Sequence, residues 1–158
     1  MTSILACTAI ATLALAGQAF AQDDRDQWPE GSARHTLLVE AEREQVLRSA
    51  LDAAHARLLD AFDDAPDDPD PLARAVDAQQ QAWLAYRGND CQLAGMLTGA
   101  GGAWPHVHAL TCGNTMLAQR TALLDAAATC LKELPDGHHR SDVEACLQPL
   151  VDAPMDGP

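Results

Sequence analysis

The chain has 158 residues and a formal net charge of −13, with 23 acidic residues against 10 lysines and arginines. Such an acidic chain is repelled by nucleic acid and by anionic lipid, so its natural macromolecular partners are cationic, although acidity can also serve solubility alone. The length fits one domain, and the scarcity of Val and Ile leaves little strand-forming sequence.

The first 21 residues have the pattern of a secretory signal peptide. Residues 4–16 are almost wholly apolar, and Ala19-Phe20-Ala21 forms a small-x-small cleavage site, although no Lys or Arg precedes the apolar run. That run is too short to remain as a membrane span. We therefore predict a periplasmic or secreted protein without membrane association after cleavage. A flexible lead-in over residues 22–32 would precede a helical domain over 33–151 and a disordered tail over 152–158.

Helical spacing of the apolar residues predicts three long helices. The first runs from about Ala33 to Phe62, and Glu40 with Arg43 and Glu44 with Arg48 support its exposed face. Residues 63–70 contain five aspartates and two prolines and break this helix. Residues 70–71 (Asp-Pro) then supply an N-cap and a first-turn proline for a second helix that continues towards residue 95.

The remaining chain predicts a glycine-containing loop and two more helices. Residues 98–104 form the loop, and residues 104–108 lead into a third helix from about Leu110 to Leu134. Ser141-Asp142-Val143-Glu144 is a capping-box pattern that begins a short fourth helix, which Pro149 limits.

Removal of the signal peptide removes Cys7 and leaves an even number of cysteines, which in an exported chain indicates disulfides. The four are Cys91, Cys112, Cys130 and Cys146. Three pairings are possible, and the sequential one best suits consecutive antiparallel helices. Each bridge would close a loop of roughly 15–20 residues and contribute about 3 kcal/mol. The predicted fold is all-α: an antiparallel bundle of three main helices plus a short fourth, stapled by disulfides.

One face of the second helix carries unusual residues for a bundle. It presents, at helical spacing, Gln80, Trp83, Arg87 and Cys91, and the third helix repeats a four-residue spacing with Cys112, Met116, Arg120 and Leu124. If Cys91 and Cys112 are bonded, antiparallel packing places Arg87 beside Met116 and Trp83 beside Arg120. An arginine over an indole contributes about 0.5–2 kcal/mol. The alternative is that this face is simply a folding core.

The sequence offers little catalytic or metal-binding chemistry. No Ser, Thr or free Cys stands in a nucleophile motif, so we expect no enzyme activity and no cofactor. Two histidine pairs, His106 with His108 and His138 with His139, fall in predicted loops and lack zinc-enzyme spacing. We predict no metal site, and a weakly metal-binding periplasmic module remains an alternative.

The motif residues resemble a known family. The matching pattern is Gln80-x-Ala82-Trp83-x-x-Tyr86-Arg87-x-x-x-Cys91, then Gly101-Gly102, then Cys112 and Arg120-Thr121-x-x-Leu124. Over residues 72–124 this is similar to the lysozyme inhibitor LprI family, whose members are small, exported, helical and disulfide-bearing. The resemblance implies that Cys91 and Cys112 are the family's C-terminal cysteine pair, and that Trp83, Arg87 and Arg120 hold framework positions. Gly88 stands where the family usually has Asp.

The resemblance also implies a function, namely binding and inhibition of a lysozyme. Lysozymes are commonly basic, so an acidic surface would speed encounter in a salt-dependent way. We expect one of two segments to occlude the enzyme's cleft: the acidic residues 63–70, or residues 99–108 with Trp104 as the anchor. The aspartates concerned are Asp63, Asp64, Asp67 and Asp68. The alternative is a structural or envelope-stress protein without lysozyme activity.

Overall fold

The computed structural model describes residues 25–62 and 70–152, and this part of the chain is helical without strands. Its elements are α2 (Ala33–Leu59), α3 (Pro71–Leu97), α4 (Trp104–Lys132), α5 (Arg140–Leu147) and α6 (Pro149–Asp152). The predicted all-α bundle of three main helices with a short C-terminal piece is confirmed. That last piece is divided at Gln148 into α5 and α6.

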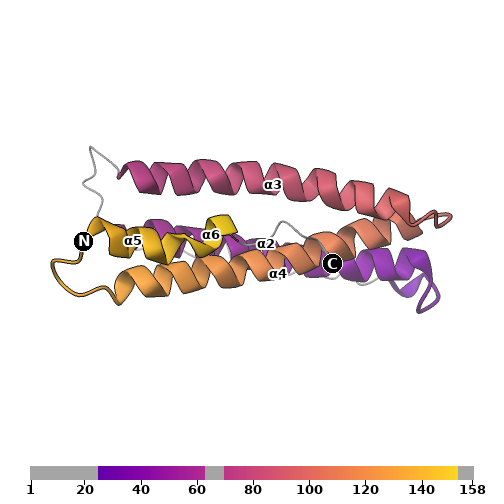
Figure 1. The fold of residues 1–158 in the computed structure, drawn as a ribbon. Helices are drawn as coiled ribbons and strands as arrows, with labels where there is room; N and C mark the ends of the chain where they lie inside the picture. The colour runs from indigo at the N-terminus through magenta and orange to yellow at the C-terminus, as the bar shows by residue number, and fades with distance from the viewer. Residues whose placement is uncertain (1–24, 63–69, 153–158) are drawn as a thin grey trace, which may run out of the picture.

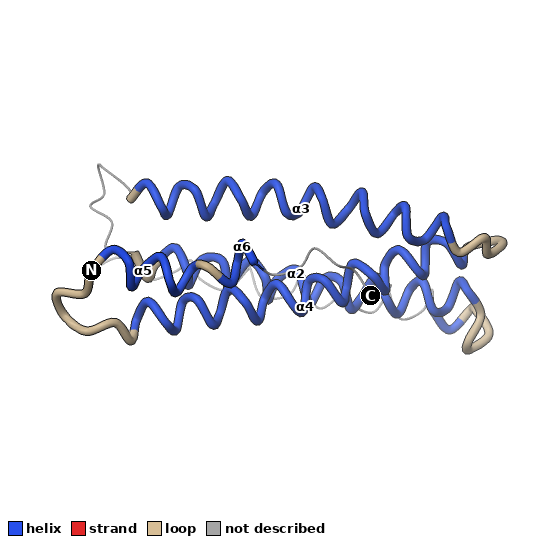
Figure 2. The backbone as a smooth tube through the Cα atoms, viewed as in Figure 1, coloured by secondary structure: helices blue, strands red, loops and turns tan. Residues whose placement is uncertain are grey.

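The three long helices form an elongated bundle in which α4 is central. It packs extensively against both α2 and α3, whereas α2 and α3 barely touch each other. The chain runs along α2, returns along α3 and runs forward again along α4, so the α3–α4 turn lies at one end of the bundle (Figure 1). The short helices α5 and α6 lie beside α4 towards the other end, and Figure 2 shows the long loop that leads into α5 there.

Local capping sets where the helices begin. Ser32 accepts a hydrogen bond from the His35 amide at 3.2 Å at the start of α2, and Asp70 accepts one from the Leu72 amide at 2.6 Å at the start of α3. The latter is the predicted aspartate cap. These side chains occupy amide groups that a helix N-terminus otherwise leaves without partners.

Two predicted helix starts are wrong. The third long helix begins at Trp104 rather than near Leu110, because Pro105 in the first turn suits a helix start. His106 therefore lies in the first turn of α4, and His108 follows Val107 in the same helix. Neither histidine lies in a loop, contrary to the prediction. The short helix begins at Arg140. The His139 amide donates to Asp142 at 2.9 Å, so the capping box is formed by His139 and Asp142, two residues earlier than predicted.

The hydrophobic core lies between α2 and α4, includes Ala73 and Val76 of α3, and extends to α5 and α6. Its four fully buried leucines come from both long helices: Leu51, Leu58, Leu117 and Leu124. Within the described ranges, none of the helices is both long and apolar enough to cross a bilayer.

Both predicted disulfides are formed with the sequential pairing. Cys91 of α3 is bonded to Cys112 of α4, with the two Cα atoms 5.5 Å apart, and this bridge lies near the α3–α4 turn. Cys130 of α4 is bonded to Cys146 of α5, with a Cα separation of 5.6 Å. The first bridge fixes the antiparallel register of α3 on α4, and the second holds α5 against the far part of α4.

Candidate functional site

The buried guanidinium of Arg120 forms a polar centre between α3, α4 and α6. Its Nε donates to Gln80 Oε1 at 2.9 Å, its Nη1 donates to the Leu150 carbonyl at 3.1 Å, and its Nη2 donates to Gln79 Oε1. Its Cζ lies 5.5 Å from the centre of the Trp83 ring, which confirms the predicted register of the two helices. Burial lowers the pKa of Arg120 to about 10, so the side chain is still a cation at neutral pH.

A groove of about 1030 Å³ lies beside this centre, bordered by α3, α4 and the α5–α6 piece. Trp83, Met116, Leu123 and Leu150 supply apolar walls. Each nitrogen of Arg120 has a protein acceptor, so at least three of its five N–H donors are used within the protein. These hydrogen bonds join α3, α4 and α6, and the arrangement therefore stabilises the packing of these three elements.

A second polar centre joins α2 to the other two long helices. Arg87 is only 6 % exposed, and its Nη2 lies 3.0 Å from Glu44 Oε1 of α2. Asn114 of α4 donates to the Glu40 carbonyl oxygen at 3.0 Å and to its carboxylate at 2.7 Å. Glu40 and Glu44, which sequence reasoning assigned to an exposed face, are thus the α2 partners of buried polar residues.

The guanidinium of Arg87 packs over a residue without a side chain. A Cβ built at Gly113 would lie 3.6 Å from Arg87 Nη1, which is ordinary van der Waals contact. The adjoining cavity of about 420 Å³ includes Gly88 and His106 in its lining. Met116 is predicted to lie beside Arg87. Its Sδ lies 3.4 Å from the Sγ of Cys91, which is one turn further along α3 than Arg87.

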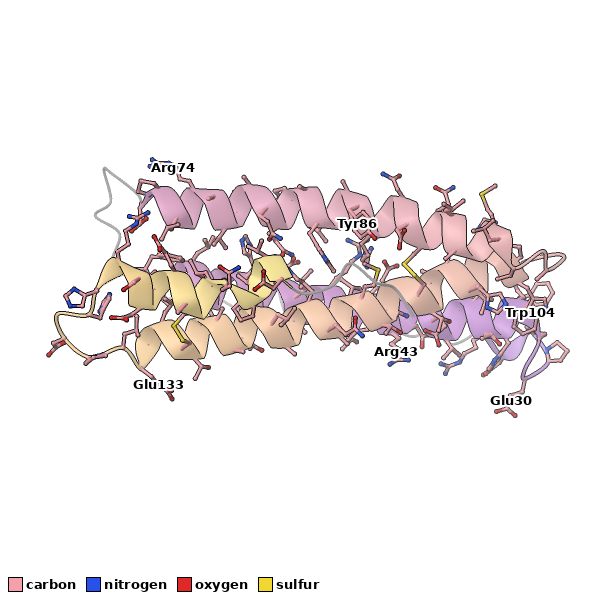
Figure 3. All side chains as sticks on the ribbon, viewed as in Figure 1. Glu30, Arg43, Arg74, Tyr86, Trp104 and Glu133 are labelled. Carbon is pink, nitrogen blue, oxygen red and sulfur yellow. A yellow bond between two sulfur atoms is a disulfide. The ribbon has the colours of Figure 1, made fainter. Side chains whose placement is uncertain are left out.

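The α3–α4 tip, which we define as Leu93, Met96, Leu97, residues 98–103 and Trp104, has a different character. Its four large apolar side chains are 55 %, 67 %, 77 % and 38 % exposed, in that order. Residues 91–119 contain no Asp, Glu, Lys or Arg, although the chain as a whole carries 23 acidic residues. The tip itself is therefore uncharged and apolar on an acidic protein, while Glu30, which precedes α2, lies at the same end of the bundle (Figure 3).

Of the two segments predicted to bind a partner, one lies within the described residues. Trp104 is in the α3–α4 tip (Figure 3). The four aspartates Asp63, Asp64, Asp67 and Asp68 lie outside the described residues, so their role in binding stays a prediction.

The predicted histidine pairs are also far apart. His106 and His108 are in the first turns of α4, and the His108 ring centre is 6.2 Å from that of Trp104. His138 and His139 lie at the other end of that helix, between α4 and α5. In the described part of the chain, no group of three or more His, Cys, Asp or Glu side chains is placed to hold a metal ion.

These features define a class of protein: a small, disulfide-stapled helical bundle organised around Trp83 and two buried arginines. A family model described as Lysozyme inhibitor LprI matches residues 32–124, which is more than half of the chain, and the protein belongs to this family. The match begins at Ser32, the cap of α2, so it covers a helix that the motif resemblance over residues 72–124 had left out. Comparison with curated proteins and with solved structures gave no match.

Proposed function

We propose that the protein is an exported inhibitor that binds a basic lysozyme-type muramidase and occludes its cleft. The observation that carries this proposal is membership of the lysozyme inhibitor family over residues 32–124. The charge of −13 supports it, because an acidic protein is attracted to a basic enzyme and binds it faster.

Export is part of the proposal and has its own support. The first 21 residues have a signal-peptide pattern, and the structure contains two disulfides, which persist in oxidising compartments outside the cytosol. Mass spectrometry of the protein from the periplasm or medium should give a chain that begins at Gln22. A chain that keeps its first 21 residues and stays in the cytosol would contradict export.

The experiment for the function is a cell-wall lysis assay with the oxidised mature protein and lysozymes of several structural classes. We expect inhibition at low salt that weakens at physiological salt, because the Debye length falls to about 8 Å at 0.15 M. Replacing Asp63, Asp64, Asp67 and Asp68 with Ser should slow association and flatten the salt dependence. If no lysozyme class is inhibited, the proposal is wrong, and the structural or envelope-stress reading takes its place.

A further inference from the structure

We propose that the α3–α4 tip is the surface that enters the lysozyme cleft, with Leu93, Met96 and Leu97 as binding residues alongside Trp104. This inference rests on the proposed function. Leu93, Met96 and Leu97 are three and four positions apart, so they share one side of α3. All three are more than half exposed, which is unusual for large apolar side chains gathered at one place.

The tip carries exposed apolar side chains on both of its helices. Gly95 faces α4, since a Cβ built there would lie 2.3 Å from the Pro105 carbonyl oxygen. Leu93 and Leu97 are two positions before and after it, each about 200° around the helix, so they point away from α4. Trp104 stands across the turn as the first residue of α4. A cleft that receives the tip would meet apolar side chains from both helices.

The tip is held rigidly by covalent and packing contacts between its two helices. The Cys91–Cys112 bridge joins α3 and α4 just below the tip, and the close contact of Gly95 with Pro105 joins them at it. Within the turn, Thr98 Oγ1 donates to the Gly95 carbonyl oxygen at 2.7 Å and accepts from the Ala100 amide at 3.3 Å. A preorganised surface loses little conformational entropy on binding, which favours affinity.

The charge pattern selects the kind of partner. The tip lies in a stretch without formal charges, between Asp90 and Arg120, while the rest of the chain is strongly acidic. The complementary partner has a recess within a basic surface, because apolar side chains gain from leaving water in a recess and the acidic body is attracted to the basic surroundings. The substrate cleft of a basic muramidase is such a recess, and a tip without carboxylates brings no like charge to the catalytic carboxyl groups there.

Of the two segments considered for occlusion, the tip is the one whose exposed apolar side chains can be buried in a cleft. The acidic residues 63–70 then contribute long-range attraction to a basic enzyme.

The test compares three variants of the full mature protein in the lysis assay, using a lysozyme that the wild type inhibits. Trp104→Ala and the double variant Leu93→Gln/Leu97→Gln should each weaken inhibition by about tenfold or more. The matched control is Val46→Gln, which removes an apolar side chain that is 70 % exposed on α2 and should leave inhibition within about twofold. Thermal melts of all three should match the wild type, because the replaced side chains are exposed.

Competition with tri-N-acetylchitotriose then locates the contact on the enzyme. If the tip occupies the cleft, the apparent Kd of the wild type rises linearly with the concentration of the free sugar, as competition for one site requires. Tip variants that inhibit as well as the wild type, or binding indifferent to the sugar, would refute the tip while leaving the inhibitor function standing. A wild type that inhibits no lysozyme would remove both proposals.

Discussion

Replacing Gly95 with Ala tests the close approach of α3 and α4 at the tip. A Cβ at this position would lie 2.3 Å from the Pro105 carbonyl oxygen, 3.0 Å from Ala109 Cβ and 3.1 Å from the Ala109 amide nitrogen. Two of these three atoms belong to backbone and the third is fixed to it, so the helices must separate by about 1 Å. Overpacking of this kind costs about 1–3 kcal/mol. In the upper part of that range, the overpacking cost exceeds the gain in helix propensity of about 1 kcal/mol that Ala brings to a helix interior.

The same substitution at Gly88 provides a control on the same helix. No atom lies within 4 Å of a Cβ built at Gly88, so Ala there gains helix propensity without strain. We expect Gly88→Ala to stabilise the protein by about 0.5–1 kcal/mol and Gly95→Ala to destabilise it by about 1–2 kcal/mol. Near roughly 4 °C per kcal/mol, the two Tm values should differ by about 6–12 °C in melts followed by circular dichroism at 222 nm. If Gly95→Ala melts as high as Gly88→Ala, the tight contact at Pro105 does not exist.

Three further experiments test the contacts that hold the bundle together. Arg120→Lys should cost about 2–4 kcal/mol in urea unfolding, because an ammonium cannot reach three acceptors held in a guanidinium fork; an unchanged midpoint would argue against that hydrogen-bond set. Leu117→Ala should cost about 2–5 kcal/mol because its side chain is fully buried, whereas Val46→Ala should stay within about 0.5 kcal/mol. The pair Cys130→Ser and Cys146→Ser should raise hydrogen exchange over residues 140–152 while leaving residues 91–112 protected; equal exposure of both regions would mean that the two bridges are not independent.

Much of the bundle could be predicted because its evidence is local. Apolar periodicity located the long helices, and Asp70 with Pro71 marked the start of α3 as the structure has it. The contact of Trp83 with Arg120 could also be predicted, because a disulfide between Cys91 and Cys112 fixes the register from which helical spacing counts outward.

The contacts of α2 could not be predicted, because they depend on which side of that helix faces the bundle. Glu44 has Arg48 four positions later and does pair with it at 3.2 Å, so the local pattern of an exposed face was satisfied. The same carboxylate also meets Arg87, 43 positions away. Sequence spacing carries no information on such a distant partner. In the sequence, an acidic residue that lies half-buried beside a buried arginine cannot be distinguished from one that is exposed to solvent.

The early start of α4 was missed for a related reason. Residues 98–103 contain three glycines, and this composition indicates a loop, but it does not say where the loop ends. Pro105 was the available signal, since proline suits the first turn of a helix. The earlier start places Trp104 on a helix end rather than in a mobile loop, which bears on the role proposed for the α3–α4 tip.

The C-terminal piece shows that the folded unit extends beyond the family match. That match ends at residue 124, yet one of the three acceptors around Arg120 is the carbonyl oxygen of Leu150. A buried guanidinium that loses an acceptor keeps its desolvation cost, about 1–3 kcal/mol or more for a charged group. Leu150 is itself buried, and the Cys130–Cys146 bridge holds the preceding helix against α4. The second disulfide therefore supports the polar centre of the family core by fixing the backbone that completes it.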